Sequence, residues 1–263
     1  MKLTYYHVDA FSSEPFKGNP AAVCVTDKPL DDVVMQKIAA EFNLPASTFL
    51  YRDLNGWHIR WYAPGAEIKL CGHGSIAAAK VLYEEGIVPI DNELVFVSRD
   101  QVEVLAQRKG EKLSIKLPVI PAYEKIDLPD DIKEAFDAKI ICATKHQNGY
   151  LLQLGSEQEV RGLVPNFHVL AQYKAVFIVT AKGVKDYDFV SRVFVPFAGI
   201  NEDPVTGSAH ACLASFWSNE TGRDVFKAFQ ASARGGVIGL QVEGDHVTLS
   251  SEAYIMGKGY IAI

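Results

Sequence analysis

Residues 60–79 read RWYAPGAEIKLCGHGSIAAA, and residues 192–212 read RVFVPFAGINEDPVTGSAHAC. Each stretch begins with Arg, reaches Pro four residues later, and passes through a loop to a Gly-Ser pair and small residues. The two arginines are 132 residues apart and the two Gly-Ser pairs 133, close to half of the 263-residue chain. Strand–turn–helix units also recur by chance in α/β proteins. The shared order of Arg, Pro and Gly-Ser nevertheless favours a duplication.

The rest of the chain shows the pattern of a strand-rich α+β protein. Helices are predicted at about 74–85 and 206–220, each followed by a Gly suited to a left-handed C-cap, and a third, amphipathic helix at 31–42. Alternating or β-branched segments predict strands at 4–11, 21–26, 57–61, 94–97, 102–106, 113–117, 173–180, 188–195, 237–242 and 246–249. A proline-rich linker is predicted at 118–131. We therefore expect two α+β halves facing each other across a cleft.

The composition excludes several classes of protein. With 48% hydrophobic and 22% charged residues the chain is neither disordered nor of low complexity. No apolar run approaches the roughly 20 residues of a membrane helix. A net charge of −6 makes nucleic acid and acidic membranes unfavourable partners. The N-terminus lacks the pattern of a signal peptide, and four scattered cysteines predict neither a zinc site nor a disulfide framework, so we expect a cytoplasmic protein.

The starts of the two repeated helices are the candidate site. A helix N-terminus presents unpaired N–H groups and a partial positive charge, so it can bind an anion without a basic side chain. Cys71 and His73 enter the first helix, while Glu202 and Asp203 precede the second, which carries His210. These groups could move a proton between carbon atoms. Each also has an ordinary structural alternative, because a lone Cys is usually buried packing and Asp before Pro is usually a cap or turn.

Motifs for bound cofactors are weak or missing. Residues 72–77 match the G-x-G-x-x-A dinucleotide pattern, but Asp91 precedes its strand instead of ending it, and a βαβ setting is lacking. The sequence has no nucleophile elbow, P-loop or HExxH motif, and its seven histidines show no metal-ligand spacing. We therefore expect neither a cofactor nor a metal.

Four blocks of the sequence resemble the phenazine-biosynthesis isomerase-like (PhzF-like) proteins. They are residues 9–11 (DAF) with 16–23 (FKGNPAAV), residues 70–74 (LCGHG), residues 201–210 (NEDPVTGSAH) and residues 233–236 (ARGG). The matches span the chain in order, and the E-D-P-x-x-G-S-A block is the most specific. The resemblance implies the diaminopimelate epimerase-like fold, in which two pseudo-symmetric barrel-like sheets each surround a central helix.

The resemblance also implies boundaries and roles. Residues 1–118 would form the first half, joined by a C-terminal strand at 255–263, and 119–254 the second. The protein would be a cofactor-independent isomerase of a small carboxylate, commonly paired as a homodimer. Asp203 and His73 would carry proton transfer, with Cys71 as a possible second acid/base, and Asn19 would polarise the substrate. The carboxylate would be held at Gly72, Gly74, Ser75, Gly207 and Ser208.

One departure from the family puts catalysis in doubt. Members usually read N-L-S-E-[ST]-x-F after the first helix, and that glutamate is their general acid/base. Residues 43–49 here read NLPASTF, with Ala46 at the glutamate position. Losing a general acid/base commonly slows a reaction by a factor on the order of 10² to 10⁴. Either Asp203, His73 or Cys71 carries the chemistry, or the protein binds a carboxylate without turning it over.

Overall fold

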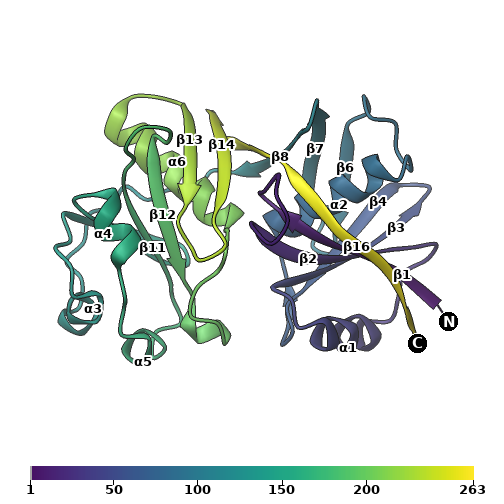
Figure 1. The fold of residues 1–263 in the computed structure, drawn as a ribbon, viewed down its shortest axis with the longest axis horizontal. Coiled ribbons are helices and arrows are strands. Elements are labelled where there is room, and N and C mark those ends of the chain that lie inside the picture. Colours follow the sequence, from purple (N-terminus) through teal and green to yellow (C-terminus); the bar gives the residue numbers. More distant parts are fainter. Residues whose placement is uncertain (1) are drawn as a thin grey trace. The chain divides into compact units, whose positions relative to one another are not determined.

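The computed structural model describes residues 2–263, which divide into two units. The first unit runs to Leu117 and includes Ser250–Ile263 (purple, blue and bright yellow in Figure 1). Its elements are β1 (Lys2–Ala10), β2 (Asn19–Thr26), α1 (Asp32–Phe42), β3 (Ala46–Asp53), β4 (Gly56–Tyr62), β5 (Glu67–Ile68), α2 (Gly72–Glu84), β6 (Leu94–Ser98), β7 (Glu103–Lys109), β8 (Lys112–Pro118) and β16 (Ala253–Ala262).

The second unit comprises Pro118–Leu249. Its elements are α3 (Asp130–Phe136), β9 (Cys142–His146), β10 (Gly149–Gln153), α4 (Glu157–Gly162), α5 (Phe167–Leu170), β11 (Val176–Lys182), β12 (Phe189–Phe194), the 3₁₀ turn η1 (Pro196–Ala198), α6 (Gly207–Thr221), β13 (Val225–Gln230), β14 (Gly236–Glu243) and β15 (His246–Ser251).

The sheet of the first unit curves around helix α2. Its strand order is β16-β1-β2-β3-β4-β6-β7-β8, with β5 added to β4. Helix α2 contacts β1, β2, β3, β7 and β16, which come from both ends of that order, so the sheet must wrap around it (Figure 1). The sequence of α2 suits this central position, because its Ala-rich run offers an apolar surface on every side.

The sheet of the second unit, β15-β14-β13-β12-β11-β10-β9, repeats the pairing pattern of the first. Along β1-β2-β3-β4-β6-β7 the pairs are antiparallel, parallel, antiparallel, parallel and antiparallel. Along β9-β10-β11-β12-β13-β14 they follow the same order. In both units the buried helix follows the fourth strand of this series. The duplication predicted from the sequence is thus confirmed by topology.

The helices predicted from the repeat agree with the structure to within two residues. Gly222 closes α6 in the left-handed region (φ 68°), and Gly86, one residue beyond the C-cap of α2, has φ 64°. Asp31 caps α1 by accepting hydrogen bonds from the first-turn N–H groups of Val33 and Val34. Among residues 2–263, none of the helices combines the length and the hydrophobicity that a membrane-spanning segment requires.

The second unit contains elements that the sequence interpretation missed. These are β9, β10, β13 and the short helices α3, α4 and α5. The segment predicted as a linker is also more ordered than expected: the Ile126 N–H donates to Ala143 O (3.0 Å), and Lys125 forms a β-bridge with Thr144. The end of this segment therefore covers the edge of β9.

Candidate functional site

The first turn of helix α2 is not capped by the side chain of its N-cap residue. That residue, Cys71, is extended (φ −132°, ψ 105°), and the Cys71 side chain makes no cap hydrogen bond. Ser75 N–H is the first to bond back, to Cys71 O at 3.0 Å, and the Ser75 hydroxyl donates to the same oxygen at 2.8 Å. The N–H groups of Gly72, His73 and Gly74 precede that first intrahelical bond and have the geometry of an anion site. Ser75, predicted to bind the ligand, has both donors engaged inside the turn.

Close packing leaves no room for a side chain at position 74, which is a glycine. A Cβ at Gly74 would lie 2.7 Å from Thr48 Oγ1 and 2.7 Å from Trp61 Cδ1. Both residues are fully buried on neighbouring strands β3 and β4. The first turn of α2 is therefore pressed against the sheet, and this contact determines where its N–H groups lie.

Cys71 and His73 form a thiol–imidazole pair at this helix start. The distance from Cys71 Sγ to His73 Nδ1 is 3.4 Å, and both side chains are buried. Burial lowers the pKa of His73 to about 4, so its imidazole is neutral at pH 7. A neutral imidazole next to a thiol can hydrogen-bond the sulfur or a reacting group, and its low pKa makes it a weak base at pH 7.

Asn19 and Ala46 lie at the starts of adjacent parallel strands. Asn19 is the first residue of β2 and Ala46 the first of β3, with Ala46 in register with Ala21. Both Asn19 and Ala46 are fully buried, and α2 packs on both strands. Residue 46, where the sequence resemblance leads us to expect a glutamate, is therefore a buried methyl group here.

The side chain of Thr206, the N-cap residue of helix α6, makes no cap hydrogen bond either. Its hydroxyl instead donates to Asp203 Oδ2 at 2.6 Å. The Asp203 N–H donates to Val193 O on β12 at 3.0 Å. Gly207 is buried while Ser208 is exposed, and both N–H groups lie in the uncapped first turn. Asp203 and two of the predicted anion donors thus lie around one helix start.

His210, which the sequence suggested as a group that could transfer a proton, is fully buried. Its Nδ1 lies 2.8 Å from Thr206 O, and its Nε2 lies 3.5 Å from Ser191 Oγ. The sequence interpretation missed a different residue, Gln230, whose buried amide contacts Thr206 and Asp203. The nearby 233–236 motif was the only sequence signal near it.

The repeated arginines hold the segments that lead into both helices. Arg60 binds Glu67 through two nitrogens, one of them at 2.9 Å, and also reaches Asp32 at 2.8 Å. Arg192 binds Glu202 through two nitrogens at 2.8 and 2.9 Å. Such two-point pairs fix orientation as well as position. Each arginine therefore ties its strand to the loop before the central helix.

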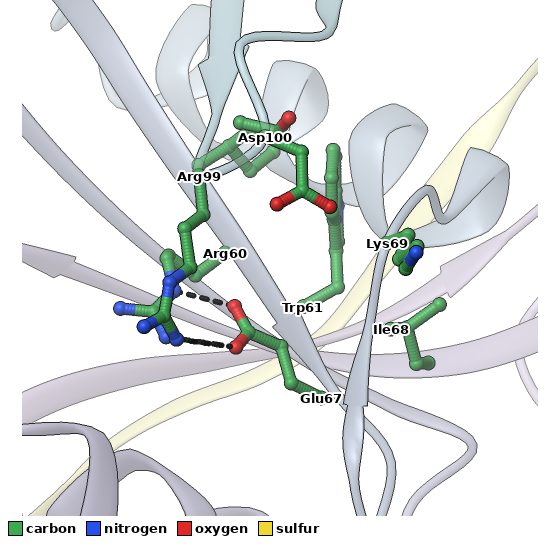
Figure 2. Close-up of a pocket in the computed structure, with 9 residues that line it drawn as sticks. Arg60, Trp61, Glu67, Ile68, Lys69, Arg99 and Asp100 are labelled. Atoms are coloured by element: carbon green, nitrogen blue, oxygen red, sulfur yellow. Dashed lines mark hydrogen bonds and ion pairs between the residues drawn. The ribbon is translucent and has the colours of Figure 1, made fainter.

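A small cavity of about 240 Å³ adjoins the Arg60 network in the first unit. Figure 2 shows the Arg60 and Arg99 guanidinium groups both directed at the Glu67 carboxylate. The lining consists of Ile59, Arg60, Trp61, Glu67, Ile68, Lys69, Ser98, Arg99 and Asp100. Arg60 and Glu67 form an ion pair with two hydrogen bonds to each other. This wall of the cavity therefore mainly holds β5 and the loop that follows it in place.

The comparison with protein families identifies the fold. The model of the phenazine biosynthesis-like protein family (PhzC-PhzF) matches residues 8–263. The chain belongs to this family. An uncharacterized isomerase of Pseudomonas aeruginosa is 38% identical over 265 residues, covering 100% of both chains. An uncharacterized isomerase of Halalkalibacterium halodurans is 36% identical, covering 96% of each.

Solved structures agree with this membership. A PhzF-family phenazine biosynthesis protein of Enterococcus faecalis superposes with a TM-score of 0.94 at 37% identity, covering 100% of both chains. A hydroxyproline epimerase of Agrobacterium vitis superposes with a TM-score of 0.65 at 12% identity, which shows a shared fold alone. The predicted α+β, epimerase-like fold is confirmed, and PhzF-family membership supports an isomerase- or epimerase-type function.

The dinucleotide pattern at residues 72–77 is explained by the fold. All six residues lie inside α2, which runs unbroken from Gly72 to Glu84. A dinucleotide fingerprint instead forms a tight loop between a strand and a helix. Among residues 2–263, no group of three or more His, Cys, Asp or Glu side chains could hold a metal ion.

Proposed function

We propose that this protein is a cofactor-independent isomerase that moves a proton between carbon atoms of a small carboxylate-bearing metabolite. The observation that carries the proposal is the pairing of acid/base side chains with an uncapped helix start in each unit. Cys71 and His73 are in contact at the start of α2, and Asp203 lies beside the start of α6. The isomerase-type family supports the same reaction class.

In this proposal the substrate carboxylate accepts hydrogen bonds from first-turn N–H groups. Gly72 and Gly74 are the candidate donors on α2, and Gly207 and Ser208 are those on α6. The geometry favours this role because these N–H groups lie ahead of the first intrahelical bond of each helix. Asn19 polarises a substrate group from the start of β2.

The proton steps use Asp203 and the Cys71–His73 pair. Asp203, as a carboxylate, removes a proton from one carbon, and the electron pair moves into the conjugated system of the substrate. The Cys71 thiol then delivers a proton to the second carbon, while neutral His73 hydrogen-bonds the reacting group and stabilises the thiolate. Ala46 cannot take part, since a methyl group carries no acidic proton.

A second candidate function is carboxylate binding without turnover. Ala46 is the observation that favours it, because the resemblance implies an acid/base glutamate at that position while both helix starts keep their matching residues. In that case the helix starts would still hold an anion, and no hydrogen of the ligand would exchange with solvent.

Deuterium exchange separates the two functions. The protein is incubated in deuterated water with a panel of amino carboxylates and cyclohexadiene carboxylates, and mass spectrometry records uptake. The isomerase proposal expects uptake that Asp203→Asn abolishes, that Cys71→Ser reduces, and that Cys142→Ser on strand β9 leaves unchanged. Binding without uptake in the whole panel would support the second function.

The missing glutamate can also be restored. Ala46→Glu is expected to create or strongly raise turnover of a dihydroaromatic amino acid, since it returns the family's carboxyl group to β3. No change in turnover would show that the geometry around residue 46 differs from that of the relatives.

A further inference from the structure

The amide of Gln230, at the end of β13, binds the segment before helix α6 at two points. Its Oε1 accepts a hydrogen bond from Thr206 N–H at 2.8 Å, and its Nε2 donates to Asp203 O at 2.7 Å. The side chain has no exposed surface. Because a backbone N–H can only donate and a carbonyl can only accept, these two partners determine which end of the amide is nitrogen.

This orientation gives direction to a chain of hydrogen bonds. Gln230 Nε2 also lies 3.4 Å from Thr206 Oγ1, where it can only donate. The Thr206 hydroxyl therefore keeps its own hydrogen for Asp203 Oδ2, at 2.6 Å. The chain runs from Gln230 through Thr206 to Asp203 and ends on a carboxylate, the strongest acceptor of the three.

The same segment is held on its other sides. Ser232 Oγ, on the loop after β13, donates to Pro204 O at 2.6 Å, and Asp203 N–H donates to Val193 O at 3.0 Å. The register of β12 and β13 pairs Ser191 with Gln230, which brings Gln230 next to the segment. The backbone around Asp203 is thus anchored from two neighbouring strands.

We propose that Thr206 and Gln230 are positioning residues for Asp203: their hydrogen-bond chain orients the carboxylate and favours its ionised form. That Asp203 acts in catalysis rests on the proposed function. The effect of Thr206 and Gln230 on the Asp203 carboxyl group does not depend on it. Thr206 acts directly on Asp203, whereas Gln230 acts through Thr206 and through the Asp203 backbone.

The charged and titratable groups on the elements packed around this segment include Arg192, Glu202, His210 and Arg234. Glu202 is paired with Arg192, and burial lowers the pKa of His210 to about 4, so that its ring is neutral above pH 5. Arg234 lies on the loop that carries Ser232. Substitution of Thr206 changes none of these groups, so a change in Asp203 titration would report on the hydroxyl.

The test compares Thr206→Val, which removes the hydroxyl at nearly constant volume, with Thr206→Ser, which restores it. Carboxyl carbon NMR of aspartate-labelled protein follows the titration of Asp203, assigned with Asp203→Asn. We expect Thr206→Val to raise the Asp203 pKa by about one unit, since a hydrogen bond to the ionised form is lost. Thr206→Ser should titrate like the unmodified protein. Thr221→Val is the matched control, because its hydroxyl bonds Trp217 O at the far end of α6.

Gln230→Met provides a second variant if Thr206→Val does not fold, and it should shift the same titration upward by a smaller amount. An Asp203 titration unchanged in both variants would overturn the inference. The NMR measurement needs no substrate, so it is independent of the proposed function. A shifted titration with no deuterium exchange in any substrate would support the positioning role and count against the isomerase. Where exchange occurs, Thr206→Val should move the acidic limb of its pH profile upward by the same amount.

Discussion

His210 is expected to make the protein lose stability in mild acid. It is buried inside α6, and its Nδ1 faces Thr206 O at 2.8 Å, so the ring hydrogen is on Nδ1. Nε2 then accepts a long hydrogen bond from Ser191 Oγ at 3.5 Å. Protonation would put a charge into this dry site, and burial accordingly lowers the pKa of His210 to about 4.

The sign and size of the effect follow from proton linkage. Between pH 6.5 and 4 the unfolded chain takes up a proton at His210 and the native state does not, so stability falls as the pH falls. From pH 7.5 to 5.0 a shift from 6.5 to about 4 costs about 2 kcal/mol of unfolding free energy. Buried His73, whose pKa is also lowered to about 4, adds a similar amount. Above pH 7.5 both contributions are constant.

Urea unfolding at pH 7.5 and 5.0 measures this dependence. Trp217 stacks on Phe189 at 5.6 Å inside the second unit, and a Trp57→Phe/Trp61→Phe background, used for all variants, leaves its fluorescence as the report of unfolding there. His210→Gln keeps a donor for Thr206 O but cannot titrate, and we expect its loss between the two pH values to be about 2 kcal/mol smaller than that of the unmodified protein. His168→Gln, on the exposed face of α5, is the control. Equal losses in all three proteins, or an NMR titration of His210 near 6.5, would refute the reasoning.

Three further experiments, two of them with a matched control variant, test the packing. Gly149→Ala would place a Cβ 2.1 Å from a backbone oxygen of β11 and should cost about 4 kcal/mol or prevent folding, whereas Gly244→Ala, with φ 62° and open space, should cost about 1 kcal/mol. Thermal unfolding compares the two. Arg60→Met should cost about 2 kcal/mol because its side chain is largely buried with a two-point carboxylate partner, and Arg99→Met, 59% exposed, less than about 0.5 kcal/mol. Equal losses of stability in Arg60→Met and Arg99→Met would contradict the role of Arg60 in holding β5. Phe189→Ala should cost about 4 kcal/mol by urea titration, and a loss below about 1 kcal/mol would show that its fully buried site collapses.

Local signals predicted the central helices and the repeat well. Gly-Ser followed by small apolar residues, with a Gly at the end, specifies a buried helix through hydrogen bonds within one segment. The hairpin of β9 and β10 was missed although Asn148-Gly149 is a turn signal, because its strands are only five residues each and lie beside charged residues. Strand β13 was missed because its residues, VFKAFQ, do not alternate between apolar and polar, although exposed and buried positions do alternate along the folded strand.

The candidate site was predicted in part. Cys71, His73 and Asp203 were selected from their place before each helix, and the structure adds the 3.4 Å contact of the thiol with the imidazole. His210 looked equally reactive in the sequence but is enclosed in the core of α6. No sequence pattern pointed to Gln230. Its contact with Thr206, 24 residues earlier in the chain, depends on the register in which β12 and β13 pair.

The amino-acid sequence by itself determined the family, the doubling of one topology, and the presence of Ala46 where the resemblance leads us to expect a glutamate. These are properties of residue identity and order along the chain. The tertiary structure alone decided which polar groups meet: the Gln230 amide with Thr206, the Arg192 fork with Glu202, and the packing of Thr48 and Trp61 that leaves no room for a side chain at Gly74. The reason is that such contacts depend on how strands distant in the chain pair and how closely a helix approaches them, to within a fraction of an ångström.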